Sequence, residues 1–200
     1  PFWIFNAAEQ MSAGQPSRSI ELENSIGNLT PEEASKEIKY ISYLAQSTDN
    51  KLIRQLEPQG FKKFLVNFWR SKDPTGMMRY RYLARVEAAN ERYGTSLKEG
   101  WRSDRGRVLM LYGEASSLER IPFTKYGDPD MEIWYYDQIQ GGSMFIFSDE
   151  KSTGDMLQVY STIQEEYVDI GWVTDFERRF GMQVKDIMYN RPKIFDRTQE

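Results

Sequence analysis

Apolar residues recur at helical spacing through the first half of the chain. The clearest stripe places large side chains three and four positions apart and consists of Phe61, Phe64, Leu65, Phe68 and Trp69. This spacing puts them on one face of a helix, which we expect to contribute to a core. The helix should end at Asp73-Pro74, because proline cannot continue it. A longer helix is predicted from Thr75 to Tyr93, with arginines that include Arg79 on its exposed face.

A local hydrogen-bonding pattern marks the start of an earlier helix. Thr30 precedes Pro31, and Glu33 follows three residues after the threonine. A hydroxyl cap, a proline in the first helical position and a glutamate that reaches back form a capping box, so a helix is predicted to begin here. A second, short helix is expected from Thr48 to about Pro58.

The second half of the chain shows strand signals instead. Val108 to Tyr112 is an unbroken apolar run between two glycines, which favours a strand buried on both faces. Residues 113–130 are then predicted to form an irregular loop. Two further runs, residues 131–137 and 144–149, are expected to form a hairpin, and residues 156–160 are expected to form a fourth strand.

These patterns predict an α+β fold in which N-terminal helices pack on a small, mostly antiparallel four-stranded sheet. We expect residues 1–29 to be a linker or the end of an upstream domain, residues 30–162 to be the α+β domain, and residues 163–200 to be a C-terminal helix with an extended arm. Thr174 and Glu177 form a capping box that is expected to start this helix. The chain has no initiating methionine and no signal-peptide pattern, which is typical of a portion of a longer polypeptide.

Apolar residues near both ends of the chain are interface candidates. Phe2 lies in a short apolar segment at the start, and Ile194 and Phe195 lie in the polar C-terminal arm. Exposed apolar arms are unfavourable unless a partner covers them. We therefore expect these residues to contact other protein subunits.

The densest set of unusual residues lies between the two halves, in Gly100-Trp101-Arg102-Ser103-Asp104-Arg105. Trp101 is expected to fill the joint between helices and sheet. Asp104 is expected to accept backbone N–H bonds in the turn from Ser103 to Gly106, and Arg105 is expected to bind a carboxylate or carbonyl groups. These residues form either a site for an anionic ligand or a sugar, or a buried corner with one aromatic plug and two satisfied charges.

A second candidate binding surface follows from the alternation of side chains in the 131–137 strand. Trp134 and Tyr136 share one face with Glu132, because successive side chains in a strand point to opposite faces. Aromatic rings beside a carboxylate are typical of sugar-binding surfaces. The same pattern is also typical of a sheet face on which helices pack.

The stretch around Trp101 resembles the signature of the GWxTD-domain family of bacterial proteins, whose name is matched by Gly100, Trp101, Ser103 and Asp104, with serine in place of the threonine. Asn90–Gly94, Glu132–Tyr136 and Gly141-Gly142 extend the similarity, which spans roughly residues 51–162. The resemblance implies a protein of the bacterial cell envelope, on its periplasmic or extracellular side. It implies no established activity.

The composition excludes several kinds of chemistry. The chain has no cysteine and no histidine, which excludes disulfides, Cys/His zinc sites and histidine-based catalysis. An enzyme would have to rely on carboxylates, Lys, Tyr, Ser or a hard metal ion. Carboxylates do occur in the predicted loop at Glu114, Glu119, Asp128 and Asp130, but their spacing matches no calcium loop, and we predict no metal site and no cofactor. No apolar run approaches the ~18 residues that span a bilayer.

Charge is distributed unevenly along the chain. Twelve Lys/Arg and five Asp/Glu lie between Gly60 and Arg107, a net charge of +7, which leaves −11 for the other residues of a chain with a net charge of −4. A basic segment can bind an anionic partner. No arginine-rich strip with interleaved aromatic residues is present, so we expect solvated or internally paired side chains and no nucleic-acid binding.

The sequence favours a non-catalytic interaction or structural module of a larger bacterial cell-envelope protein or assembly, with other protein subunits as partners. The alternative is a carbohydrate- or ligand-binding domain that contacts the envelope or its glycans through Trp101, Trp134 and Tyr136. A hydrolase of this kind would need two carboxylates ~5–10 Å apart across a cleft.

Overall fold

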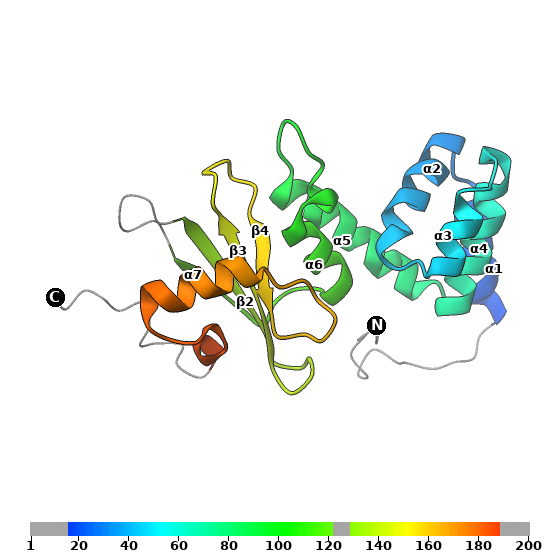
Figure 1. The fold of residues 1–200 in the computed structure, drawn as a ribbon. Helices are drawn as coiled ribbons and strands as arrows, with labels where there is room; N and C mark the ends of the chain where they lie inside the picture. Colours follow the sequence, from blue (N-terminus) through cyan, green and yellow to red (C-terminus); the bar gives the residue numbers. More distant parts are fainter. Residues whose placement is uncertain (1–15, 122–128, 189–200) are drawn as a thin grey trace. The chain divides into compact units, whose positions relative to one another are not determined.

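The computed structural model describes residues 16–121 and 129–188. These residues belong to two compact units that divide between Arg92 and Tyr93. The first unit is helical, and the second contains the sheet (Figure 1). The single domain predicted for residues 30–162 therefore contains parts of both units.

The helical unit consists of five α-helices with two short 3-10 segments, in the order α1 (Pro16–Gly27), α2 (Pro31–Tyr40), η2 (Ile41–Tyr43), α3 (Ser47–Ile53), η3 (Pro58–Gly60), α4 (Phe61–Lys72) and α5 (Met77–Tyr93). The predicted capping box forms at the start of α2, where the Thr30 hydroxyl accepts from the Glu33 N–H and the Glu33 carboxylate accepts from the Thr30 N–H. The predicted stripe of α4 is confirmed, since Phe64, Leu65 and Phe68 are buried with Trp69.

A buried carboxylate joins three helices of this unit. Glu37 of α2 accepts a hydrogen bond from the Trp69 indole of α4 at 2.7 Å and a two-pronged one from the Arg79 guanidinium of α5 at 2.8 and 2.7 Å. A buried charge is tolerated when it is paired and hydrogen-bonded in this way. Arg79 therefore faces the interior, and the prediction that it lies on the exposed face of its helix is wrong.

The helical unit also begins earlier than the sequence analysis expects. Pro16–Gly27 forms helix α1 within the stretch predicted to be a linker. Leu22 and Ile26, one helical turn apart, are buried, and α1 contacts α4. Two apolar residues at i and i+4 are enough to attach a short polar helix to a core that is already present.

The sheet unit contains η4 (Gly100–Arg102), α6 (Asp104–Tyr112), β1 (Ser117–Ile121), β2 (Asp130–Tyr136), β3 (Ser143–Asp149), β4 (Leu157–Ser161), α7 (Ile170–Phe180) and η5 (Val184–Met188). The four strands lie in the order β1-β2-β3-β4, and every neighbouring pair is antiparallel. The predicted α+β class with a four-stranded antiparallel sheet is confirmed.

Both faces of the sheet are covered. Met131, Ile133 and Tyr135 of β2 point to the face where α7 and η5 pack, and Phe176 of α7 belongs to the same core cluster. On the opposite face, the Tyr136 and Phe145 rings contact Tyr112 of α6 at centroid distances of 6.1 and 5.2 Å. The central strands are therefore buried on both sides, which explains why β3 is buried at every position.

The central apolar run is a helix, and our prediction of a strand from Val108 to Tyr112 is wrong. The Ser103 side chain caps the helix at its start, and Gly113 (φ +81°) ends it. An apolar run of five residues fits a buried helix as well as a buried strand. The missing strand is β1, which lies in the predicted loop and is short, largely exposed and at an edge of the sheet.

Helix α7 also begins earlier than predicted. Its N-cap is Asp169, whose carboxylate accepts from the Trp172 N–H at 3.0 Å. The Thr174 hydroxyl instead donates to the Ile170 carbonyl within the helix. The predicted capping box of Thr174 and Glu177 is therefore wrong, because a better-placed acceptor starts the helix one turn sooner.

The C-terminal part of the described chain returns to the sheet unit. Val184 and Ile187 of η5 are buried in the same cluster as Phe176. The interface candidates Phe2, Ile194 and Phe195 lie outside the described residues. The described helices are all too short or too polar to span a membrane.

Replacement of Glu37 tests the buried pairing in the helical unit. Glu37→Gln removes the charge opposite Arg79, and removing one partner of a buried ion pair costs about 3 kcal/mol or more. We expect a loss of this size in the free energy of unfolding, measured by guanidinium chloride titration of the helical circular dichroism signal. Glu32→Gln, at an exposed position of the same helix, should change it by less than about 0.5 kcal/mol. Equal effects of the two substitutions would contradict the role given to Glu37.

Candidate functional site

The signature residues build a tight turn between η4 and α6. The Ser103 hydroxyl donates to the Gly100 carbonyl at 2.7 Å and accepts from the Gly106 N–H at 3.0 Å. One side chain thus closes η4 and satisfies an N–H of the first turn of α6. The sequence analysis assigns this capping role to Asp104, and the structure gives it to Ser103.

Gly106 has a steric reason to be glycine. A Cβ atom built at this position would lie 1.9 Å from the Gly100 carbonyl oxygen, a backbone atom that cannot rotate away. The two backbone segments approach each other so closely that only a residue without a side chain fits between them. The spacing of Gly100, Ser103 and Gly106 is therefore a packing requirement of the turn.

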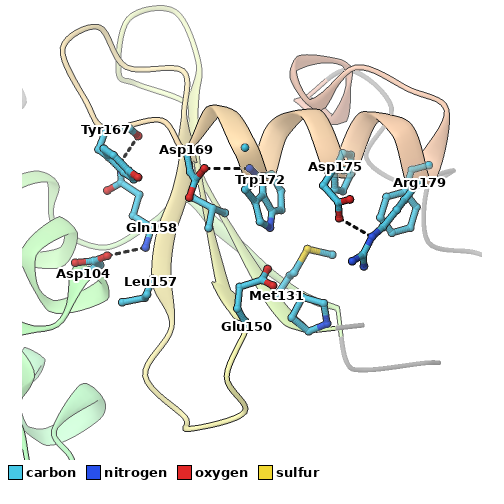
Figure 2. A pocket seen from close by; sticks show the side chains of 15 residues that line it. Asp104, Met131, Glu150, Leu157, Gln158, Tyr167, Asp169, Trp172, Asp175 and Arg179 are labelled. Atoms are coloured by element: carbon cyan, nitrogen blue, oxygen red, sulfur yellow. Dashed lines mark hydrogen bonds and ion pairs between the residues drawn. The ribbon is translucent and has the colours of Figure 1, made fainter. Parts of the chain in front are cut away.

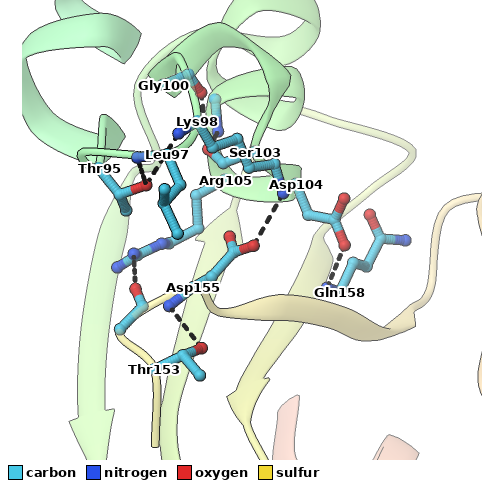
Figure 3. Close-up of polar contacts among 12 residues, drawn as sticks. Thr95, Leu97, Lys98, Gly100, Ser103, Asp104, Arg105, Thr153, Asp155 and Gln158 are labelled. Atoms are coloured by element: carbon cyan, nitrogen blue, oxygen red, sulfur yellow. Dashed lines mark hydrogen bonds and ion pairs between the residues drawn. The ribbon is translucent and has the colours of Figure 1, made fainter. Parts of the chain in front are cut away.

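Trp101 and Asp104 connect this turn to its surroundings. The Trp101 ring is 5% exposed, and its indole N–H donates to Glu99 at 3.0 Å. The Asp104 carboxylate accepts from the Gln158 backbone N–H at 2.7 Å, which joins α6 to strand β4 (Figure 3). Asp104 thus takes an edge N–H of the sheet as its partner, a contact that sequence spacing could not predict.

Arg105 and Glu132 form a second buried pair in the protein, on the α6 side of the sheet. The guanidinium lies 3.4 Å from the Glu132 carboxylate, donates to the Gly154 carbonyl at 3.0 Å and covers the Tyr93 ring at 4.8 Å. Glu132 also accepts from Arg120. Arg105 binds both kinds of acceptor named in the sequence analysis, a carboxylate and a carbonyl.

The aromatic candidates Trp134 and Tyr136 lie inside the protein. The Trp134 ring is 2% exposed and donates to Glu132, and Tyr136 is 3% exposed and donates to the Gly113 carbonyl. Both share the face of Glu132, as predicted, and this is the face on which α6 packs. A sugar stacks on exposed ring faces, and these two rings and that of Trp101 present none in this structure.

Arginines of the basic segment also pair with carboxylates within their own units. Arg70 binds Glu23, Arg79 binds Glu37, and Arg105 binds Glu132. This supports the interpretation that the excess of positive charge in the segment is compensated inside the fold.

A polar cluster fixes the segment between β4 and α7. Arg107 of α6 donates to Glu166 at 2.5 and 3.1 Å and to the Gln158 side chain at 2.6 Å, and the Tyr112 hydroxyl donates to Glu166 at 2.6 Å. Burial alone would raise the pKa of Glu166, but the hydrogen bonds from Arg107 and Tyr112 outweigh it and lower this pKa. Burial and the neighbouring carboxylate raise the pKa of Tyr112.

A groove of about 460 Å³ lies between α7 and the sheet (Figure 2). Its apolar lining comes from both sides and includes Met131, Leu157, Val159, Trp172, Phe176 and Phe180. A smaller hollow of about 350 Å³ adjoins it and shares Asp104, Gln158 and Tyr167 with it. Among the groove residues, Leu157 is 41% exposed and Tyr167 is 61% exposed.

The sequence analysis finds one wall residue of this groove, Asp104, and misses the others. They come from β2, β4, α7 and the segments that flank the strands and α7, which are far apart in the chain, so no local motif brings them together. The one local signal is Tyr167, a large residue that follows the polar run Gln164-Glu165-Glu166.

The carboxylates of the predicted loop do not gather into a metal site among the described residues, where no group of three His, Cys, Asp or Glu side chains could hold an ion. Glu119 accepts a hydrogen bond from the Tyr135 hydroxyl at 3.0 Å. Asp128 lies outside the described residues.

A family model described as the GWxTD domain matches residues 28–178. The match extends the similarity in both directions beyond residues 51–162 and includes α2 and most of α7. No curated protein and no solved structure matches the chain.

Substitution of Gly106 tests the close approach in the signature turn. Gly106→Ala places a methyl group against the Gly100 carbonyl, and we expect it to lower the free energy of unfolding by about 3 kcal/mol or more. Gly27→Ala is the matched control, because a Cβ there meets no atom within 4 Å. Thermal and denaturant unfolding of the two variants should differ clearly, and near-wild-type stability of Gly106→Ala would show that the turn can open.

The pH dependence of stability tests the Glu166 cluster. A carboxylate whose pKa is lowered by folding stabilises the protein above its unfolded pKa, near 4.5, and this contribution is lost as the pH falls through the lower folded value. We expect Glu166→Gln to be less stable than wild type by about 1–3 kcal/mol at pH 7. The difference should shrink as the pH is lowered below about 4.5.

Glu91→Gln, at an exposed position, serves as the control and should follow the wild-type profile at every pH. A difference between Glu166→Gln and wild type that stays constant from pH 7 to pH 3 would contradict an ionised, hydrogen-bonded Glu166.

Proposed function

Starting from the fact that this chain belongs to the GWxTD-domain family, because the family model covers three quarters of it, we propose that it is a non-catalytic interaction module of a larger bacterial cell-envelope protein or assembly. The observation that carries this proposal is the groove between α7 and the sheet. It exposes the large side chains of Leu157 and Tyr167 beside an apolar interior. Exposed apolar residues at the mouth of a groove are characteristic of protein contact sites.

The charged residues of the signature support the same proposal. Asp104 binds a backbone N–H of β4, and Arg105 binds Glu132 and the Gly154 carbonyl. These contacts hold the fold together, and a side chain committed to such contacts is poorly placed to move a proton. The groove is then the surface best suited to a partner.

A cell-envelope location, on the periplasmic or extracellular side, is part of the proposal and rests on the family. The absence of cysteine from the chain is compatible with this compartment, since it leaves no thiol to oxidise. The alternative function as a glycan-binding domain receives less support, because Trp101, Trp134 and Tyr136 are buried.

The experiment that tests the proposal compares two double variants of the native protein in its own cells. Leu157→Ser with Tyr167→Ser removes the exposed apolar contacts of the groove. Leu97→Ser with Tyr80→Ser makes the same two changes at more exposed residues, 96% and 71% accessible, that do not line it. Each protein is isolated gently from the envelope and weighed by native mass spectrometry.

We expect a partner in fixed ratio with the wild-type and control proteins, and about a tenfold smaller bound fraction with the groove variant, since residues at the centre of an interface each contribute a kcal/mol or more. If wild-type protein arrives alone, or if both variants retain the partner equally, the groove is not the interaction site and the proposal fails.

A further inference from the structure

We propose that the groove between α7 and the sheet binds a cationic, amphipathic peptide segment of a partner protein, in which one or two large apolar side chains are flanked by Lys or Arg. This inference rests on the proposed function and specifies the chemistry of the partner.

The interior of the groove fits large apolar side chains. The Met131 and Val159 side chains contribute the sheet wall, and the Trp172, Phe176 and Phe180 rings contribute the helix wall. Trp172 and Phe176 stack with centroids 5.1 Å apart, so the helix wall is a continuous aromatic surface. A volume of about 460 Å³ lies in the range of sites that enclose a ligand, and it leaves room for an inserted leucine or phenylalanine.

The walls of the groove and its adjoining hollow are strongly acidic. Six carboxylates line the two cavities, from Asp104, Glu150, Glu165, Glu166, Asp169 and Asp175, against the two guanidinium groups of Arg107 and Arg179. An excess of negative charge around an apolar interior attracts a cationic ligand and repels nucleic acid or anionic lipid headgroups.

The acidic groups differ in how far they are neutralised inside the protein. Asp175 is paired with Arg178 and Arg179, and Glu166 is paired with Arg107. Asp104 and Asp169 each accept a backbone N–H, and Glu150 accepts the Ser148 hydroxyl. A neutral hydrogen-bond donor leaves the negative charge of its acceptor in place. Asp169 and Glu150 therefore carry the potential of the groove, together with Asp104, whose charge also interacts with Arg107.

Figure 2 shows the three carboxylates on different sides of the apolar interior, with Asp104 beside Gln158, Asp169 at the start of α7 and Glu150 beside Met131. We call these three carboxylates the acidic rim of the groove. A large apolar side chain, the anchor, would enter the groove while the positive side chains that flank it approach the rim. A neutral sugar has no charge with which to use the rim, and an anionic ligand is repelled by it. A cationic peptide with an apolar centre matches both features.

The test measures binding of the fluorescein-labelled peptide GKKLFKKG to the intact chain by fluorescence anisotropy. In 50 mM salt we expect a dissociation constant on the order of 10 µM, and about tenfold weaker binding in 500 mM salt, because screening shortens the range of the rim charges. The peptides GSSLFSSG, without the charges, and GKKSSKKG, without the apolar anchor, should each bind at least about tenfold more weakly than the parent peptide.

A matched pair of charge reversals locates the site. Glu150→Lys changes the rim, and Glu91→Lys makes the same change of net charge at an exposed position of the helical unit. We expect Glu150→Lys to weaken binding of GKKLFKKG about fivefold, the size of an exposed charge–charge contact, and Glu91→Lys to leave it unchanged. Equal effects of the two reversals would show general attraction to an acidic protein and would overturn the proposal.

Two further outcomes would also overturn it. The first is equal binding of GKKLFKKG and GSSLFSSG. The second concerns residues 191–197 of this chain, which combine Arg191, Lys193 and Arg197 with Ile194 and Phe195. If the peptide binds only after Arg191→Glu, Lys193→Glu and Arg197→Glu are introduced together, the groove takes this segment of its own chain and not a partner.

The outcome for the peptide is separable from the outcome for the proposed function. If the Leu157→Ser and Tyr167→Ser protein loses its partner in cells while GKKLFKKG fails to bind the wild-type chain, the groove remains the interaction site and the cationic chemistry is wrong. If the partner is retained by that variant, the proposed function falls, whatever the peptide does.

Discussion

The sheet unit depends on a contact between two backbone segments that leaves no room for a side chain. Gly106 lies against the Gly100 carbonyl, and the Ser103 hydroxyl joins the two segments by one hydrogen bond in each direction. This contact sets the direction in which α6 leaves η4. With the direction fixed, Tyr112 meets the rings of Tyr136 and Phe145, and Asp104 meets the edge of β4. The signature residues thus position α6 on one face of the sheet.

Each unit also contains a buried carboxylate that is stabilised by the same kinds of partner. Glu37 is buried in the helical unit and holds the Trp69 indole and the Arg79 guanidinium. Glu132 is buried in the sheet unit and holds the Trp134 indole with Arg105 and Arg120. A carboxylate that cannot be hydrated is stabilised when a cation pairs with it and another donor fills a remaining lone pair. The tryptophans of these clusters are therefore hydrogen-bonding groups as well as core residues.

Sequence reasoning succeeds where a periodic pattern is long and fails where it is short. The stripe of α4 fixes both the helix and its buried face, and the alternation in β2 correctly separates Trp134 and Tyr136 from Met131 and Ile133. Val108–Tyr112 is too short to distinguish a helix from a strand, and the deciding signal was the serine cap before it. The prediction also misplaces Arg79, because pairing with Glu37, 42 residues away, overrides the polar character of its position. The groove is absent from the prediction for the same reason, since its walls meet only in the folded chain.

Asp104 has two properties that serve different ends. The hydrogen bond that joins α6 to β4 requires an oxygen that can accept the Gln158 N–H, and a neutral amide would supply one. The negative charge, which the hydrogen bond to β4 does not need, lies at the wall of the groove and interacts with Arg107. An aspartate at this position therefore does more than hold β4. A chain of this fold with asparagine there would keep the hydrogen bond to β4 and have a less acidic groove. One side chain could then change which ligand the groove selects while the fold stays the same.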